Sequence, residues 1–358
     1  MKSILVTGGS GFIGRFLILE LLKRGHRVSA LLRQPDTQLA TLRQWLAGHG
    51  VDATGLQAVR GDLKQPGAGI SRQDWQRLSD VTAIYHSGAL FAWNLSPEDA
   101  RQVNVTGALE LMRAAATHLR LERFVQVSGY MLTMTDHLRR LEIQGDGASA
   151  DWPAIYARTG AYEASKLESH FTIQREAAAL KIPLTVIHPA TLVGHADTGE
   201  LPENQEMARS IRQLVAGRIP AAPGGCGYRL PLVSADYLTR FMAGVIDFPE
   251  TEGQEYLLAD AETPDLKTVL TQCAHAAKAR PPKLVAPVPL LKAVVQWPWL
   301  AKQAGISREQ IHFLRKEALD TSATERLAGR MGVHKPQLAP VLAKTTTWLL
   351  AQQATSAA

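Results

Sequence analysis

The stretch Thr7-Gly8-Gly9-Ser10-Gly11-Phe12-Ile13-Gly14 decides the fold of this 358-residue chain. It follows residues 3–7, a short apolar run that is typical of a buried parallel strand. An apolar helix is predicted through residue 22, and Gly25 ends it before a second strand at residues 27–32. Dinucleotides bind at such a turn, because its glycines let a pyrophosphate approach the N-terminus of the helix. We therefore predict a dinucleotide site at this turn.

The end of the second predicted strand indicates which dinucleotide binds. An acidic residue there would accept a hydrogen bond from the ribose 2′-hydroxyl of NAD, whereas an arginine accommodates the 2′-phosphate of NADP. The residue at this position is Arg33, and Arg15 offers a second cation, while Asp36 lies beyond Pro35 and too far along the chain. The predicted cofactor is therefore NADPH.

Alternating strands and helices continue through the N-terminal half. Further strands are predicted at residues 56–59, 81–86 and 124–128, with helices at residues 37–47, 72–78 and 97–118. Right-handed crossovers between such strands give an α/β fold, a doubly wound parallel-sheet Rossmann domain that binds ligands at the carboxyl ends of its strands. We assign residues 1–190 to this domain, with 228–247 returning to it. Residues 191–227 and 248–358 are expected to form a smaller, mostly helical substrate domain.

Tyr162 and Lys166 lie four residues apart, so on a helix they share one face. An ammonium beside a phenol favours the phenolate and lowers the phenol pKa from about 10, as a general acid or base at neutral pH requires. The helix is predicted to continue to residue 180, with Leu167, Phe171, Ile173, Ala177 and Leu180 buried and Glu168, Gln174, Arg175 and Glu176 in solvent. The alternative is that this stretch is an ordinary solvated helix face.

Composition excludes several functional classes. The chain is 46% hydrophobic and 20% charged, which is ordinary for a globular protein, and its net charge of +6 comes without a basic cluster that would favour nucleic acid. Cys226 and Cys273 lie far apart, so we expect a reducing, cytoplasmic compartment. No apolar run is long enough to span a membrane. His86, His188 and His195 show no paired ligand spacing, so no metal site is predicted.

Five motifs together resemble the extended short-chain dehydrogenases/reductases, in order and approximate spacing, over residues 2–194. They are Thr7-Gly8-x-x-Gly11-Phe12-Ile13-Gly14, Gly61-Asp62-Leu63, Asn104-Val105-x-Gly107, Tyr162-x-x-x-Lys166 and His188-Pro189-Ala190-Thr191. Within this region, residues 61–78, Tyr85-His86-Ser87-Gly88-Ala89 and Asp197-Thr198-Gly199-Glu200 are similar to the thioester and fatty acyl-CoA reductase branch. The end of the chain departs from that branch's pattern.

The resemblance implies roles for individual residues. Tyr162 is implied as the catalytic acid/base, and Lys166 as the residue that holds the nicotinamide ribose. The implied cofactor contacts are Gly8, Gly11, Phe12, Ile13 and Gly14 at the pyrophosphate, Arg33 at the 2′-phosphate, Asp62 and Leu63 at the adenine, Ser87, Gly88 and Ala89 along the cofactor, and Pro189, Ala190, Thr191 and Leu192 at the nicotinamide.

The sequence departs from the family where a hydroxyl usually polarises the substrate carbonyl. Gly129 stands at that position and Ser128 comes one place early, which in a strand would turn its side chain to the opposite face. We take Ser128 as the third catalytic candidate, with Tyr130, Thr133 or a water as substitutes. Losing one such donor typically costs about 10²–10³ in rate without abolishing the chemistry.

These observations favour an NADPH-dependent reductase of an aldehyde or ketone on a non-sugar, hydrophobic small molecule. Residues 290–300, with Trp297 and Trp299, are expected either to line a hydrophobic substrate or to form an ordinary core helix. The alternatives are an acyl-thioester reductase, a nucleotide-sugar epimerase or dehydratase, and a non-catalytic NADP(H)-binding sensor. By analogy with the family, helices at residues 97–118 and 160–180 would pair in a homodimer.

Overall fold

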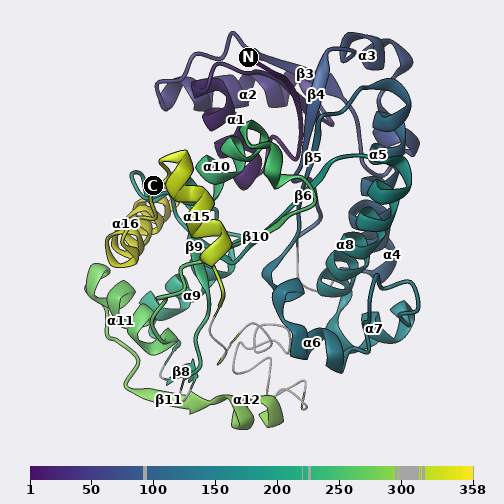
Figure 1. The fold of residues 1–358 in the computed structure, drawn as a ribbon. Helices are drawn as coiled ribbons and strands as arrows, with labels where there is room; N and C mark the ends of the chain where they lie inside the picture. The colour runs from purple at the N-terminus through teal and green to yellow at the C-terminus, as the bar shows by residue number, and fades with distance from the viewer. Residues whose placement is uncertain are drawn as a thin grey trace. The chain divides into compact units, whose positions relative to one another are not determined.

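A computed structural model describes residues 1–91, 95–219, 221–224, 227–294, 297, 314, 316 and 319–357 (Figure 1). The chain divides into two units. The first comprises Met1–His188 and Thr239–Tyr256, and the second comprises Pro189–Leu238 and Leu257–Ala358. The glycine turn, Arg33, Ser128, Tyr162 and Lys166 therefore all belong to the first unit.

A seven-stranded sheet, in the order β10-β6-β5-β4-β1-β2-β3, organises the first unit. Neighbouring strands from β1 to β6 run parallel, and β1 pairs with both β2 and β4. This order confirms the predicted doubly wound Rossmann fold. The strands are β1 (Ser3–Thr7), β2 (Arg27–Leu32), β3 (Leu56–Arg60), β4 (Val81–His86), β5 (Arg123–Val127), β6 (Leu184–Pro189) and β10 (Glu255–Leu258).

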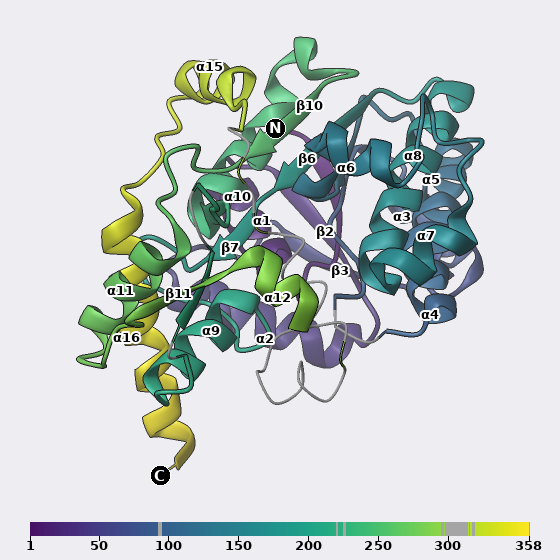
Figure 2. The ribbon, with the colours of Figure 1, turned by 90° about the horizontal axis from the view of Figure 1, so that it is seen from below.

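Helices cover both faces of this sheet. Helices α1 and α2 lie on one side, whereas α5 and α8 pack against each other on the other (Figures 1 and 2). The core between α5 and the sheet is built from buried Leu5, Ile84, Leu111 and Phe124. The helices are α1 (Phe12–Lys23), α2 (Pro35–Gly48), α3 (Arg72–Arg77), α4 (Pro97–Arg101), α5 (Gly107–His118), α6 (Thr135–Arg140), α7 (Trp152–Thr159) and α8 (Ala161–Leu180), with short helical turns at Pro66–Gly69, Tyr130–Thr133, Val245–Asp247 and Pro249–Thr251.

Two helices differ from the sequence prediction. The helix predicted at residues 97–118 is interrupted by a π-helical turn at Gln102–Thr106, between α4 and α5. On α8, Leu167, Phe171, Ile173 and Ala177 are buried as predicted, but Leu180 is exposed. Glu168, predicted to face solvent, is only 4% exposed. It accepts hydrogen bonds from Arg101 Nε at 3.0 Å and from the Tyr156 hydroxyl at 2.9 Å, and these partners compensate for the burial of its charge.

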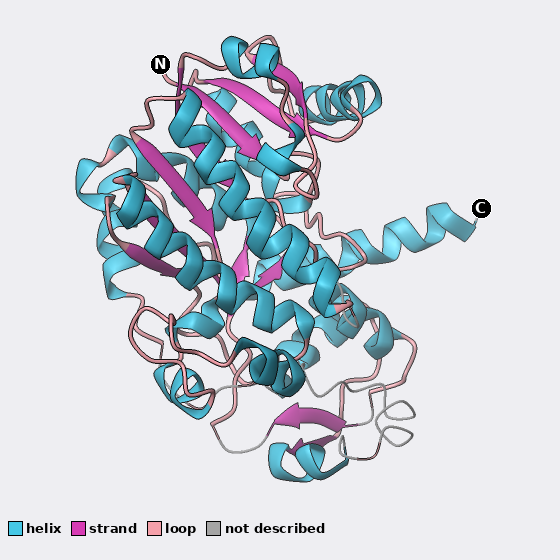
Figure 3. Cartoon of the chain, turned by 90° about the vertical axis from the view of Figure 1, so that its right-hand side faces the viewer, coloured by secondary structure: helices cyan, strands magenta, loops and turns pink. Residues whose placement is uncertain are grey.

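The second unit is mostly helical, with two pairs of short parallel strands (Figure 3). Ala221–Gly224 forms a strand because it pairs with β11 (Leu284–Pro287), more than fifty residues away in the sequence. The elements are β7 (Thr191–Val193), α9 (Glu206–Val215), β8 (Ala221–Gly224), β9 (Leu232–Ser234), α10 (Ala235–Gly244, which ends in the first unit), α11 (Leu266–Ala276), β11 (Leu284–Pro287), α12 (Val288–Val294), α15 (Ser322–Met331) and α16 (Leu338–Ala357).

Some sequence predictions fall partly outside the described residues. In the stretch 290–300, α12 accounts for the first residues and Trp297 is exposed, whereas residues 295, 296 and 298–300, including Trp299, lie outside the described residues. Cys226 also lies outside them, while Cys273 is a buried free thiol. Within the described part of the chain, no helix is both long and apolar enough to cross a membrane.

The backbone at Gly8 provides a direct test of this packing. Gly8 and Gly25 both have a positive φ, but a Cβ on Gly8 would lie 2.8 Å from Gly88 Cα, whereas a Cβ on Gly25 would meet nothing within 4 Å. We expect Gly25→Ala to lower the free energy of unfolding by about 1–2 kcal/mol, the cost of a left-handed backbone at alanine. Gly8→Ala should cost a further ~1–3 kcal/mol, as overpacking does. Urea unfolding measures both, and equal losses for the two variants would contradict this packing.

Candidate active site

The turns that follow β1 and β4 lie in contact, at the point where the strand order of the sheet reverses. Ser87 Oγ donates to Thr7 O at 2.7 Å, and Gly88 N donates to Thr7 Oγ1 at 3.1 Å. A Cβ on Gly8 would lie 2.8 Å from both Gly88 Cα and Gly88 N, so Gly8 has no room for a side chain, and a Cβ on Gly88 would have tight contacts from 3.0 Å. Dinucleotides bind at such a switch point, in the crevice outside the carboxyl ends of the strands. The structure therefore brings together Gly8, Ser87 and Gly88, three of the predicted cofactor contacts.

The start of α1 fits an anionic group. Gly11 immediately precedes α1, which has no side-chain cap and no acidic residue in its first turn. Gly11 N donates to Gly8 O at 2.9 Å, and a Cβ on Gly14 would lie 2.1 Å from the same oxygen. Free N–H groups and the helix dipole favour a negative charge at such an N-terminus. Phe12 is buried and Ile13 is half-buried in this turn. The free N–H groups of the turn fit the pyrophosphate of a dinucleotide.

The predicted adenine contacts lie beside the second glycine turn. Leu63 Cδ1 is 3.0 Å from the position that a Cβ on Gly88 would take, so the loop after β3 reaches the switch point. Asp62 is half-buried, and its Oδ1 accepts a hydrogen bond from Lys64 N at 3.0 Å. Ala89 is exposed. These positions agree with a cofactor that runs from the first glycine turn toward the end of β3.

Arg33 and Arg60 lie at the ends of β2 and β3, and Arg15 lies on α1. Arg33 is exposed immediately after β2, as a residue that reads a 2′-phosphate should be. Arg15, offered by the sequence as a second cation, packs its guanidinium over the Trp45 ring, 4.9 Å from the ring centre. Arg60, the last residue of β3, donates from Nη1 to Arg33 O at 3.4 Å. Arg60 is not among the cofactor contacts predicted above, although it directly follows the predicted strand at residues 56–59.

Lys166 lies at the carboxyl end of β5. Its Nζ donates to Val127 O at 2.7 Å, and its side chain is almost completely buried. Ser128 is the next residue along the chain; it is buried, and its backbone N donates to Ile187 O at 2.8 Å. On the preceding turn of α8, the Tyr162 ring packs edge-on against Phe91, with ring centres 4.9 Å apart. The three predicted catalytic residues thus come from α8 and from the end of the strand beside it.

The pKa shifts of the pair follow from burial. Burial lowers the pKa of the Lys166 ammonium to about 8. Burial, together with the neighbouring Glu163 carboxylate, raises the pKa of the Tyr162 phenol above its ordinary value of 10. Burial and Glu163 therefore set the direction of this shift, and the lowering by Lys166 stays a prediction. At neutral pH Tyr162 is a neutral phenol, the form that donates a proton.

Asn104 holds α8 against the loop that follows β4. Its Oδ1 accepts from Leu90 N at 2.7 Å, and its Nδ2 donates to Leu90 O at 3.2 Å and to Ser165 Oγ at 2.9 Å. Asn104 lies in the π-helical turn, and such turns are frequent at functional sites. The sequence motif contained Asn104 but did not reveal this bridge, which depends on residues from three separate segments.

Other predicted contacts lie in the second unit. Pro189, Ala190, Thr191 and Leu192 begin that unit, where Ala190 N donates to Leu258 O at 2.9 Å. Their approach to the nicotinamide remains a prediction.

Paired glycine turns at a switch point and a Tyr-x-x-x-Lys pair at the end of the next strand define a class, the NAD(P)-dependent oxidoreductases of the short-chain dehydrogenase/reductase type. Comparison with known proteins agrees with this class. Residues 6–242 match the NAD-binding family described as male sterility protein. The chain therefore belongs to this family. It is an extended short-chain dehydrogenase/reductase that is related to the thioester reductases.

Individual relatives are more distant. A carboxylic acid reductase of Segniliparus rugosus is 28% identical over 60% of this chain and 20% of its own length. The 2-alkyl-3-oxoalkanoate reductase of Stenotrophomonas maltophilia is 30% identical over 60% of this chain and 58% of that enzyme. The terminal R domain of the myxalamid PKS-NRPS pathway superimposes with a TM-score of 0.77 at 23% identity, covering 99% of this chain and 91% of that domain, and this likeness shows the shared fold. This chain spans about a fifth of several curated relatives, including an NRPS-like oxidoreductase of Fusarium equiseti.

The lowered pKa of Lys166 predicts a pH dependence of stability. Below pH 8 both the folded and the unfolded chain hold this proton, whereas between pH 8 and its ordinary pKa of 10.5 only the unfolded chain does. The wild type should therefore gain stability as pH rises through this window, by about 3 kcal/mol at ~1.4 kcal/mol per pKa unit. Lys166→Met should lack this gain. Denaturant unfolding of both proteins between pH 8 and 10.5 measures the difference. If the free energies of unfolding of the two proteins change with pH in parallel, the ammonium is not buried.

Proposed function

We propose that this protein is an NADPH-dependent reductase that transfers hydride to the carbonyl carbon of a non-sugar, hydrophobic substrate. One observation carries the proposal: the glycine turns for the cofactor and the acid–base pair lie at the carboxyl ends of three adjacent strands. Gly8 follows β1, Gly88 follows β4, and Lys166 bonds the last residue of β5. A dinucleotide cradle beside a buried acid–base pair is the arrangement that hydride transfer to a carbonyl requires.

The proposed roles follow from the charge that develops on the substrate oxygen. When bound, NADPH supplies the hydride. As negative charge grows on the carbonyl oxygen, the neutral Tyr162 phenol donates its proton to that oxygen and yields the alcohol. Lys166 stabilises the phenolate that remains, and Ser128 offers a hydrogen bond to the same oxygen. Asn104 positions α8, and with it the phenol, through its bonds to Leu90 and Ser165.

We further propose that the enzyme prefers NADPH to NADH. The arginines at the ends of β2 and β3 support this preference. Arg33 and Arg60 lie next to each other, and Arg60 also contacts Asp36 at 3.5 Å. A guanidinium on each strand end suits a 2′-phosphate, which accepts several charge-assisted hydrogen bonds.

Arg33→Ala tests this preference. A hydrogen bond to a charged group contributes about 1.5–3 kcal/mol, so NADPH should bind about 10–100-fold more weakly while NADH binding stays unchanged. Arg27→Ala is the matched control, because Arg27 begins the same strand and pairs with Asp80 at the opposite end. Nucleotide fluorescence titration measures both affinities. If Arg33→Ala weakens NADPH and NADH equally, the assigned role of Arg33 is wrong.

Acyl-thioester reduction is the second candidate. It is supported by the likeness of residues 61–78 and 197–200 to the thioester reductase branch, and by a relative named carboxylic acid reductase. Hydride addition to a thioester forms a tetrahedral oxyanion; its collapse expels a thiolate, which takes up a proton, and leaves an aldehyde. A second hydride and a second proton would then give the alcohol. A relative named for 2-alkyl-3-oxoalkanoate reduction supports the ketone alternative.

A substrate panel separates these candidates. NADPH oxidation is followed with a long-chain aldehyde, a 3-oxoalkanoate, a long-chain acyl-CoA and a nucleotide sugar, and thiol release is measured in parallel. We expect turnover with the aldehyde or ketone, or turnover with thiol release from acyl-CoA. Tyr162→Phe should bind NADPH like the wild type but turn over at least about 100-fold more slowly, because it lacks the acid. Tight NADPH binding with no turnover would indicate a sensor. Conversion of the nucleotide sugar without net NADPH oxidation, detected by chromatography of the sugar, would indicate an epimerase-like enzyme.

Three further assignments stay predictions within this proposal. They are a substrate-binding role for the second unit, a homodimer through α4, α5 and α8, and a cytoplasmic location, with which the free thiol of Cys273 agrees.

A further inference from the structure

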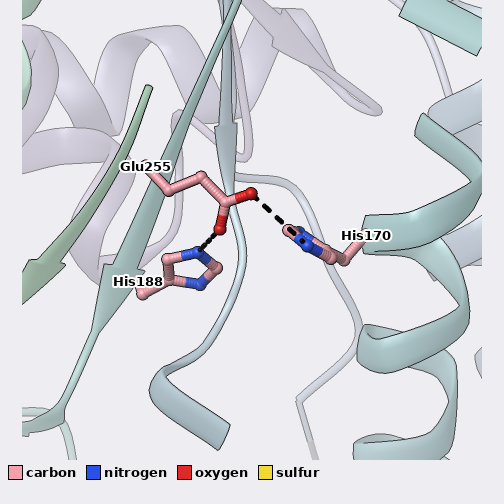
Figure 4. Close-up of side chains that lie close together, drawn as sticks. All are labelled: His170, His188 and Glu255. Carbon is pink, nitrogen blue, oxygen red and sulfur yellow. Dashed lines mark hydrogen bonds and ion pairs between the residues drawn. The ribbon is translucent and has the colours of Figure 1, made fainter. Parts of the chain in front are cut away.

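Two buried histidines and a glutamate converge in the first unit, outside the proposed reductase site. His170 comes from α8, His188 from β6 and Glu255 from the start of β10 (Figure 4). One ligand atom from each residue lies within 4.8 Å of the other two. The sequence analysis predicted no metal site, because these residues are far apart in the chain and only the fold brings them together.

The hydrogen bonds of His188 fix which of its nitrogens faces the glutamate. Nδ1 lies 3.0 Å from Gly129 O, and since a carbonyl oxygen only accepts, Nδ1 must carry a proton and donate it. The other nitrogen, Nε2, lies 2.6 Å from Glu255 Oε2. A bare nitrogen lone pair and a carboxylate oxygen repel each other at this distance. At this distance a proton must therefore lie between them, and a metal ion bound by both atoms would require them to move apart by about 0.7 Å.

A proton explains the contact between His188 and Glu255, but it does not explain the position of His170. His170 Nε2 lies 3.7 Å from the other carboxylate oxygen, Glu255 Oε1, which is too long for a hydrogen bond. His170 Nδ1 is buried and has no hydrogen-bond partner. A buried imidazole directed at a carboxylate oxygen without a hydrogen bond is suited to share a metal ion with it.

We propose that His170, His188 and Glu255 form a binding site for one divalent transition-metal ion of the Zn²⁺ type. Zn²⁺ takes nitrogen and carboxylate oxygen ligands at about 2.0–2.2 Å, which places neighbouring tetrahedral ligands about 3.3 Å apart. The two distances to Glu255, 2.6 Å to Oε2 and 3.7 Å to Oε1, lie on either side of that value, and all three ligand atoms lie within 4.8 Å of one another, so shifts of up to about 1.5 Å complete the geometry. Two imidazoles and one carboxylate leave a fourth position for water.

The surroundings of the three residues support this assignment. Metal-ligating histidines usually donate their second N–H to a backbone carbonyl, as His188 does to Gly129, and ligating carboxylates are themselves hydrogen-bonded, as Glu255 is by Gln174 Nε2. The Glu255 side chain is 40% exposed, which gives an ion access from solvent. A bound ion would join α8, β6 and β10 and would hold Gly129 at the end of β5. This proposal does not depend on the proposed reduction.

Metal binding by tag-free protein, stripped with a chelator and dialysed, tests the proposal. We expect one equivalent of Zn²⁺ to bind in competition with a chromophoric chelator, and Co²⁺ at the same site to give the visible bands of a four- or five-coordinate ion. His170→Asn and Glu255→Gln should each weaken binding at least about 100-fold, since loss of outer-shell partners alone costs 10–100-fold. His118→Asn is the matched control, because His118 is exposed on α5 and stacks on Trp75.

Circular dichroism and NADPH titration establish that each variant is folded. Should His170→Asn not fold, Glu255→Gln decides, because its side chain is partly exposed. Binding of less than one equivalent by the wild type would overturn the proposal. Equal affinity in His118→Asn, His170→Asn and Glu255→Gln would also overturn it, and the cation between His188 and Glu255 would then be a proton.

Discussion

The close approach of two backbone turns, one after β1 and one after β4, is the constraint on which the proposed site depends. Gly8 lies so close to Gly88 that it has no room for a Cβ, and Thr7 bonds both Ser87 and Gly88 across the gap. Because β1 and β4 are neighbours where the strand order reverses, this contact sets the floor of the dinucleotide crevice. Every further group in the site is positioned relative to these two strand ends.

Burial decides the chemistry of the Tyr162–Lys166 pair. An ammonium one helical turn from a phenol attracts a phenolate, but both groups are removed from water, and the desolvation cost dominates both pKa values. The result is a neutral phenol and an ammonium whose pKa is close to neutrality. Because Asn104 joins α8 to the loop after β4, the orientation of this pair is coupled to the cofactor turn rather than to α8 alone.

Local signals predicted the parts of the fold that local physics determines. The glycine turn, the parallel strands and the buried face of α8 follow from turn chemistry and hydrophobic periodicity. What could not be predicted depends on partners distant in the sequence: Glu168 is buried because Arg101 and Tyr156 bond it, Arg15 stacks on Trp45, and Ala221–Gly224 becomes a strand because β11 pairs with it. The His170, His188 and Glu255 cluster belongs to the same category, since it joins one helix and two strands.

The central claim is that hydride passes from a dinucleotide in this crevice to a substrate carbonyl beside Tyr162. Transfer of deuterium from NADPH labelled at the reactive C4 position tests it most directly, with the product analysed by mass spectrometry and NMR. The account predicts one deuterium on the carbon that was the carbonyl carbon, together with an unlabelled hydroxyl proton from solvent. A product without deuterium at that carbon would contradict the account.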